Sequence, residues 1–129
     1  VAVGLDYRRR PDGSLEAAAR GWLEGSGRTV GEVLAAVEGA PLGAVVVTAI
    51  ERDGTLAGPD LEGLGAVLDL TALPVVASGG VGSVDHLRAL AALRSPATGR
   101  ALAGAVVGRA LVDGSIDPEE AIAACAPSG

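Results

Sequence analysis

The chain has 129 residues, enough for one domain with a sizeable core. Apolar residues make up 49% of it, almost all Ala, Val and Leu, and Tyr7 and Trp22 are the only aromatic residues. A core of small branched side chains favours parallel strands covered by helices, and the lack of aromatic residues argues against a base-stacking surface. The net charge of −6, with ten scattered arginines and no lysine, argues against nucleic acid and anionic membranes as partners.

Two further features limit the class of protein. Cys125 is the only cysteine, so an internal disulfide is excluded and a cytoplasmic location is expected. One histidine and one cysteine cannot form a typical metal-ligand cluster. The chain opens with VAVGLD, the pattern of a buried strand, and we expect a truncated or excised half of a larger domain.

The first half of the sequence predicts two strand-then-helix units. Residues 1–5 form a short apolar run typical of a buried strand. After a polar stretch rich in Arg and Gly, the capping box at residues 29–32 predicts a helix to about Glu38. Residues 44–50 are strongly β-branched and predict the second strand. A helix is then expected over 60–70, with Asp60 as its N-cap.

The second half predicts two more units. Residues 74–77 form the third strand, and a glycine-rich exit turn at 78–82 leads to a helix from Ser83 to about residue 93. A loop follows, and the fourth strand is expected at 102–107. Asp117, followed by proline and two acids, predicts the start of a terminal helix.

Strands alternating with helices predict an α/β fold with a parallel sheet. The sheet is either open and doubly wound or part of a barrel, and the unit-by-unit repetition favours the barrel. In both architectures ligands bind at the carboxyl ends of the strands, which are expected near residues 6, 50, 77 and 108.

Two of these strand ends have the composition of an anion site. Ser78, Gly79 and Gly80 lie between a strand and a helix start, where glycines allow close approach and exposed N–H groups favour an anion. Gly108 and Arg109 repeat the pattern one strand later and add a guanidinium. One such turn alone is explained by tight chain reversal, whereas two consecutive turns match the usual phosphate position of a barrel.

The other strand ends offer carboxylates and a hydroxyl. Asp6 is either a hydrogen-bond acceptor or a proton-transfer group, and Asp53 is either part of an ordinary Asp-Gly turn or a catalytic acid. Thr48 either packs in the core or points its hydroxyl at the ligand. Trp22 either folds over a planar substrate or anchors its loop. Arginines 8–10 are expected to be solvated.

His86 and Cys125 are not assigned to a site. His86 is expected on the surface of the third helix, and Cys125 is expected to be inert packing near the end of the chain.

Five blocks in this order resemble one family: VAVGLD, RGW, VVTAIERDGTLAGPD, PVVASGGVGS and GAVVGRAL. The whole chain resembles the C-terminal half, strands five to eight, of the (βα)₈ barrel of the phosphoribosyl isomerases of histidine biosynthesis (ProFAR isomerases). The similarity is strongest to the actinobacterial bifunctional form, which also isomerises phosphoribosylanthranilate for tryptophan. The related cyclase of the same pathway shares the RDGT block and ranks second.

The resemblance implies an Amadori rearrangement without a cofactor. An acid protonates the furanose ring oxygen, and a base removes the C2′ proton. Asp53 matches the acid of the bifunctional form, and Asp6 matches the strand-five aspartate given that role in other members. Thr48, Trp22 and Arg20 match substrate contacts. The residues implied to hold one phosphate of the phosphorylated ribosyl substrate are Ser78, Gly79, Gly80, Gly108 and Arg109.

The sequence departs from the family in two respects. Ala49 stands where the bifunctional form usually has Asp, and the strands that carry the family's general base and second phosphate site are not in this sequence. The chain is therefore expected either to pair with the missing N-terminal half as an isomerase, or to be a non-catalytic half-barrel that binds phosphate and associates with itself through its sheet edges.

Overall fold

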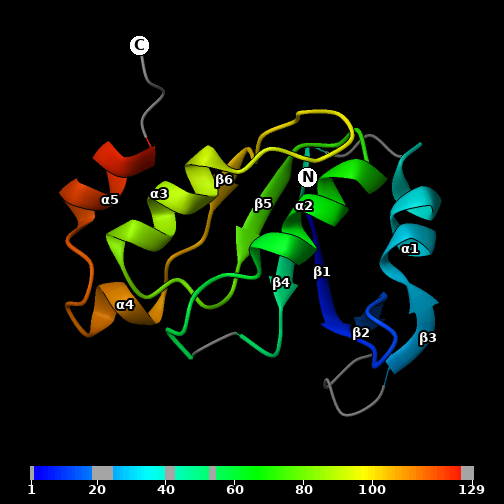
Figure 1. The fold of residues 1–129 in the computed structure, drawn as a ribbon, viewed down its shortest axis with the longest axis horizontal. Helices are drawn as coiled ribbons and strands as arrows, with labels where there is room; N and C mark the ends of the chain where they lie inside the picture. The colour runs from blue at the N-terminus through cyan, green and yellow to red at the C-terminus, as the bar shows by residue number, and fades with distance from the viewer. Residues whose placement is uncertain (1, 19–24, 40–42, 53–54, 126–129) are drawn as a thin grey trace.

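The computed structural model describes residues 2–18, 25–39, 43–52 and 55–125. Its strands form one layer, in the order β3-β2-β1-β4-β5-β6, against which helices pack (Figure 1). The strands are β1 (Ala2–Arg9), β2 (Leu15–Ala18), β3 (Gly25–Thr29), β4 (Ala44–Ala49), β5 (Val75–Ser78) and β6 (Gly104–Ala105). The helices are α1 (Val30–Val37), α2 (Leu61–Leu70), α3 (Val84–Ala92), α4 (Arg109–Val112) and α5 (Pro118–Cys125). Within these ranges no helix is long and apolar enough to span a bilayer.

The parallel part of the sheet is the one predicted from the sequence. β1, β4, β5 and β6 are successive parallel neighbours, and Figure 1 shows β1, β4 and β5 running in the same direction. Two bounds were predicted wrongly. β1 continues to Arg9 because β2 pairs with its last three residues, so Asp6 lies inside the strand and not at its end. β6 has only two residues because it is an edge strand in the described sheet.

The antiparallel hairpin of β2 and β3 was not predicted. β2 has only four residues and β3 consists of polar and small residues, so no long apolar alternation marks the hairpin. Leu15 and Ala17 of β2 are buried in the core. Charge pairing adds to this packing: Arg8 Nε lies 3.3 Å and Arg10 Nη2, just beyond β1, lies 3.2 Å from the two oxygens of Glu16. Arg8, Arg9 and Arg10 are 31%, 34% and 31% exposed and form ion pairs, so the basic run expected to be solvated is only partly exposed.

Side chains of the parallel strands alternate between a covered and an uncovered face. Leu5, Val47 and Ala77 are buried with their neighbours against the helices, in two adjoining apolar clusters. Asp6 and Thr48, which point to the other face, are only half-buried. Helices therefore cover one face of the parallel strands, as they do around a barrel.

Helix starts follow the predicted caps. The side chains of Thr29 and Ser83 accept hydrogen bonds from the third following backbone N–H, at 3.1 and 3.2 Å, and Asp117 does the same for α5. The short helix α4 was not predicted, since its four residues carry neither a cap nor a repeat. The predicted capping residues therefore located the starts of the helices that have a side-chain cap.

Asp60 caps α2 and also accepts hydrogen bonds from two side chains of β1. Its Oδ1 accepts from Gly63 N at 3.0 Å, and both of its oxygens accept from Arg9 Nη2 at 3.1 Å. The hydroxyl of Tyr7, whose side chain is 1% exposed, donates to Oδ2 at 3.0 Å. One carboxylate therefore fixes the start of α2 on the end of β1.

Replacing Asp60 with alanine is expected to lower the free energy of unfolding by about 3 kcal/mol, because it removes a helix cap and the acceptor of a partly buried arginine. Urea unfolding followed by circular dichroism measures the loss. Asp85→Ala is the matched control, since Asp85 also lies in a first helical turn and pairs with Arg88 but is 85% exposed. That variant is expected to change stability by less than about 0.5 kcal/mol. Equal losses in both variants would contradict the role given to Asp60.

The burial of Tyr7 leads us to expect that the folded chain loses stability at alkaline pH. Burial raises the pKa of Tyr7 well above its usual range, and the Asp60 carboxylate raises it further. The unfolded phenol titrates near pH ~10, so this stabilisation is complete below pH ~10 and is lost as pH rises further. Tyr7 is the only tyrosine, and tyrosinate absorbance is expected to appear together with loss of helical signal. Normal titration in a folded chain would refute this, and Tyr7→Phe is expected to flatten the alkaline decline.

Candidate active site

Three predicted polar positions lie side by side across the sheet. Asp6 of β1 is the register partner of Thr48 in β4, and Thr48 is the register partner of Ser78 in β5. All three are half-buried on the uncovered face. A carboxylate and two hydroxyls thus form one row near the carboxyl ends of three adjacent strands, where a ligand of an α/β sheet binds.

The two predicted glycine turns meet at one pocket of about 110 Å³. Arg109 lies at the start of α4, beside Gly108, and faces the exit turn of β5. The pocket is lined by Leu56, Ser78, Gly79, Gly80, Val81, Val106, Gly108 and Arg109. All five residues assigned to a phosphate from the sequence are therefore neighbours, and their role as ligands stays a prediction.

The geometry of the β5 exit turn explains its glycines. Gly79 and Gly80 have φ values of +103° and +85°, which side-chain-bearing residues rarely adopt. A Cβ on Gly80 would also overlap the carbonyl oxygen of Gly58, in the loop that follows β4. The glycines thus allow a backbone conformation and a close contact between two loops.

The start of α3 is less open than the sequence suggested. Gly82 N donates to His86 Nδ1 at 2.9 Å, and His86 N donates to the Ser83 hydroxyl at 3.2 Å. These amides are bonded within the protein, so an anion would rely on the turn and on Arg109. His86 is half-buried rather than a simple surface residue, and the capping-box spacing from Ser83 was the signal that could have identified it.

The loop between β4 and α2 borders the same pocket. Arg52 Nη1 donates to Gly58 O at 3.1 Å, and Gly58 N donates to Gly80 O at 2.8 Å. Leu56 of this loop lines the pocket. The loop is therefore hydrogen-bonded to the β5 exit turn. Three of the predicted catalytic or substrate residues lie outside the described residues: Asp53, Arg20 and Trp22.

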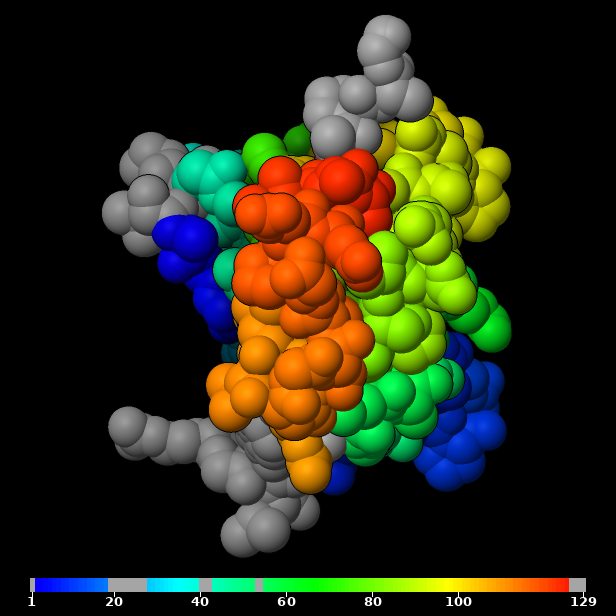
Figure 2. Space-filling view, turned by 90° about the vertical axis from the view of Figure 1, so that its left-hand side faces the viewer, coloured from blue at the N-terminus to red at the C-terminus, as the bar shows by residue number. Residues whose placement is uncertain are grey.

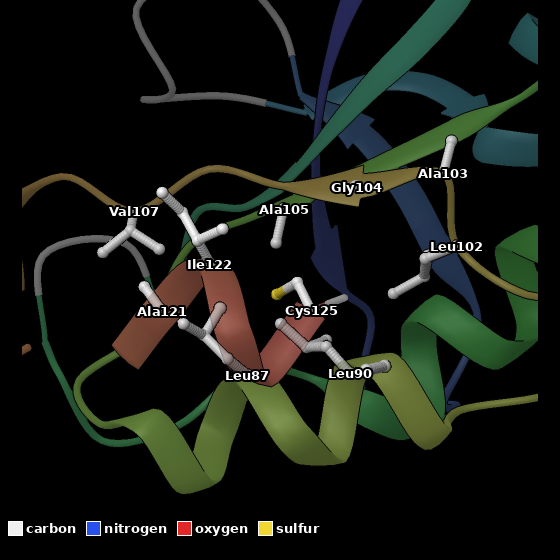
Figure 3. A pocket seen from close by; sticks show the side chains of 11 residues that line it. Leu87, Leu90, Leu102, Ala103, Gly104, Ala105, Val107, Ala121, Ile122 and Cys125 are labelled. Carbon is white, nitrogen blue, oxygen red and sulfur yellow. The ribbon is translucent and has the colours of Figure 1, made fainter. Parts of the chain in front are cut away.

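A larger cavity, of about 380 Å³, lies elsewhere, between α3, α5 and β6 (Figure 3). Leu87 and Leu90 reach it from α3, and Ile122 and Cys125 reach it from α5. Its lining side chains are apolar apart from the Cys125 thiol, so it offers no charged side chain to bind a phosphate. The smaller polar pocket is therefore the better candidate for the site. No cluster of metal-ligating side chains exists among the described residues.

Comparison with known proteins decides the family. The profile of a family described as histidine biosynthesis protein matches residues 1–117. The chain belongs to this family. Its four parallel βα units correspond to part of the family's (βα)₈ barrel, which confirms the predicted α/β half-barrel class.

Individual relatives of the chain support the same family assignment. Phosphoribosyl isomerase A of Mycobacterium avium is 48% identical over 126 residues, covering 98% of this chain and 49% of the relative. An isomerase named for a bis-phosphoribosyl imidazole-4-carboxamide, from Dinoroseobacter shibae, is 44% identical over 126 residues, covering 98% of this chain and 48% of the relative. The chain thus spans about half the length of the curated relatives it matches.

Gly80→Ala is expected to lower the free energy of unfolding by about 3 kcal/mol, because its backbone is left-handed and its Cβ would overlap Gly58. Gly108→Ala is the matched control in the same pocket. Gly108 has φ −117°, and a Cβ there meets nothing within 4 Å, so a change below about 0.5 kcal/mol is expected. Urea unfolding measures both. A Gly80→Ala protein as stable as Gly108→Ala would contradict the close contact of the two loops.

Proposed function

We propose that this chain supplies the second half of a ProFAR isomerase of histidine biosynthesis. The reaction is an Amadori rearrangement of an aminoaldose to an aminoketose, and phosphoribosylanthranilate of tryptophan biosynthesis is proposed as a second substrate. The pocket shared by two consecutive strand exits carries the proposal. The similarity to two relatives named as phosphoribosyl isomerases supports it.

The pocket is proposed to hold one phosphate of the substrate. Glycine turns let the backbone approach an anion, and the Arg109 guanidinium supplies charge and directional N–H donors. A pocket of about 110 Å³ matches a phosphate group rather than a whole nucleotide. The remainder of the substrate would then extend across the row of Asp6, Thr48 and Ser78 on the uncovered face.

Proton transfer is proposed to use Asp53 as the acid, with Asp6 as the second candidate. Protonation of the furanose oxygen breaks its bond to C1′ and gives an open-chain Schiff base. Removal of the C2′ proton gives an enolamine, which tautomerises to the ketose. Both steps move protons only, so no redox cofactor is needed. The base, by resemblance, is an aspartate of the first barrel strand. Thr48, Arg20 and Trp22 are proposed to contact the substrate.

A complementary half-barrel is the proposed partner. β2 pairs only with residues 7–9 of β1, so within the described sheet residues 2–6 have a strand on one side only, as does β6. Figure 2 shows the side of the molecule along which α4 and α5 run beside α3. Val112 and Ile122 of these helices are 90% and 73% exposed, and Val106 beside β6 is 44% exposed. Unpaired strand edges favour association with another chain. The exposed apolar residues of α4 and α5 and beside β6 favour it as well.

The test is reconstitution. The chain is co-expressed with the first half of the Mycobacterium avium relative, and ProFAR turnover is measured for the complex and for each half. We expect turnover in the complex only. Asp53→Asn is expected to lower kcat about 10³-fold as a lost general acid, and Arg109→Ala is expected to raise KM. Asp85→Asn, on the exposed face of α3, is the control and should leave both constants unchanged.

Two outcomes would overturn the assignment. A reconstituted complex without turnover, or one in which Asp53→Asn has no effect, would refute the isomerase mechanism as stated. Phosphate binding by the isolated chain, combined with a stable dimer in light scattering and an inactive complex, would support the self-associating half-barrel instead.

A further inference from the structure

His86 stands where two loops of the candidate site meet. From the first turn of α3 its Nδ1 accepts the Gly82 N–H at 2.9 Å, so this ring nitrogen carries no proton. The Nε2 edge of the same ring faces Gly58, because a Cβ built there would lie 3.4 Å from Nε2. One side chain therefore bonds the β5 exit turn and packs against the loop that follows β4.

The two loops also touch directly, backbone to backbone. Gly58 N donates to Gly80 O at 2.8 Å. A Cβ on Gly82 would overlap the backbone of Leu56, so these segments are in contact at a second point. Leu56 has φ +58°, a left-handed conformation that is strained for a non-glycine residue. A strained residue that lines a pocket requires surrounding contacts to hold it.

We propose that His86 is a positioning residue for the phosphate pocket. By holding Gly82 N–H and packing on Gly58, it keeps the Gly79–Gly80 turn and Leu56 in register around the bound phosphate. The proposal rests on the phosphate site proposed above. His86 touches no substrate and acts through the backbone of the two loops.

A purely structural role would be to start α3. Ser83 already performs that role, because its hydroxyl caps the helix through His86 N. The two roles can be separated by mutation. Ser83→Ala removes the cap and leaves the imidazole, whereas His86→Ala removes the imidazole and leaves the Ser83 cap. His86→Asn is the conservative variant, since its amide oxygen occupies nearly the place of Nδ1 and remains neutral.

The first measurement is affinity for inorganic phosphate, by NMR titration of the 129-residue chain. The loss of one hydrogen bond that orders the pocket is expected to weaken binding about five-fold in His86→Ala. His86→Asn and Ser83→Ala should remain within about two-fold of the parent chain. Unchanged affinity in His86→Ala, or an equal loss in Ser83→Ala, would overturn the proposal.

The second measurement needs no ligand. Amide hydrogen exchange of Gly58, which lies beside the His86 ring, reports whether the imidazole orders the neighbouring loop. We expect faster exchange in His86→Ala, normal exchange in His86→Asn, and little change in Ser83→Ala. If the parent chain does not bind phosphate, the proposed phosphate site fails, while Gly58 exchange still decides whether His86 joins the loops. Unchanged exchange in His86→Ala would overturn that part.

Discussion

The bonding of Asp60 to β1 is the interaction on which the candidate site depends. Its carboxylate accepts from Tyr7, Arg9 and the first turn of α2, so the start of the helix is tied to β1. The loop after β4 must then run from the sheet to this fixed point. On the way Arg9 N binds Glu51 Oε1 at 2.7 Å, and Gly58 reaches the β5 exit turn. A partly buried polar network thus ties Glu51 to β1 and Asp60 to β1 and α2.

The sequence predicted most of the fold where local and long-range signals agree. β4 is strongly β-branched, and α1, α2 and α3 each begin with a side-chain cap. These elements formed as predicted because propensity, capping and burial favour the same conformation. The β2–β3 hairpin has no such agreement. It depends on pairing with the extended end of β1 and on Glu16, which are tertiary contacts that a local pattern does not contain.

The site was predictable in part for the same reason. Ser78–Gly80 and Gly108–Arg109 follow buried strands, and parallel strands bring their carboxyl ends together, so their shared pocket follows from connectivity. Asp6 was placed at a strand end because the apolar run stops there. The structure extends β1 beyond it, yet the register still sets Asp6 beside Thr48. His86 was missed because its importance comes from Gly58, which is 28 positions earlier in the chain.

The two proposed roles, phosphate binding and proton transfer, would require different surroundings in this half of a barrel. The pocket proposed to hold phosphate is lined by residues 56–109, all of them in this chain, so the proposed binding can be a property of the half alone. The row from Asp6 to Ser78 instead lies on a sheet face that no described helix covers. Water at that face screens charge, and preorganised electrostatic stabilisation is weak in a high dielectric. A second half that closes the barrel would exclude this water and add its own carboxylate. For the proposed isomerase, barrel closure would therefore change the turnover number far more than the affinity for phosphate.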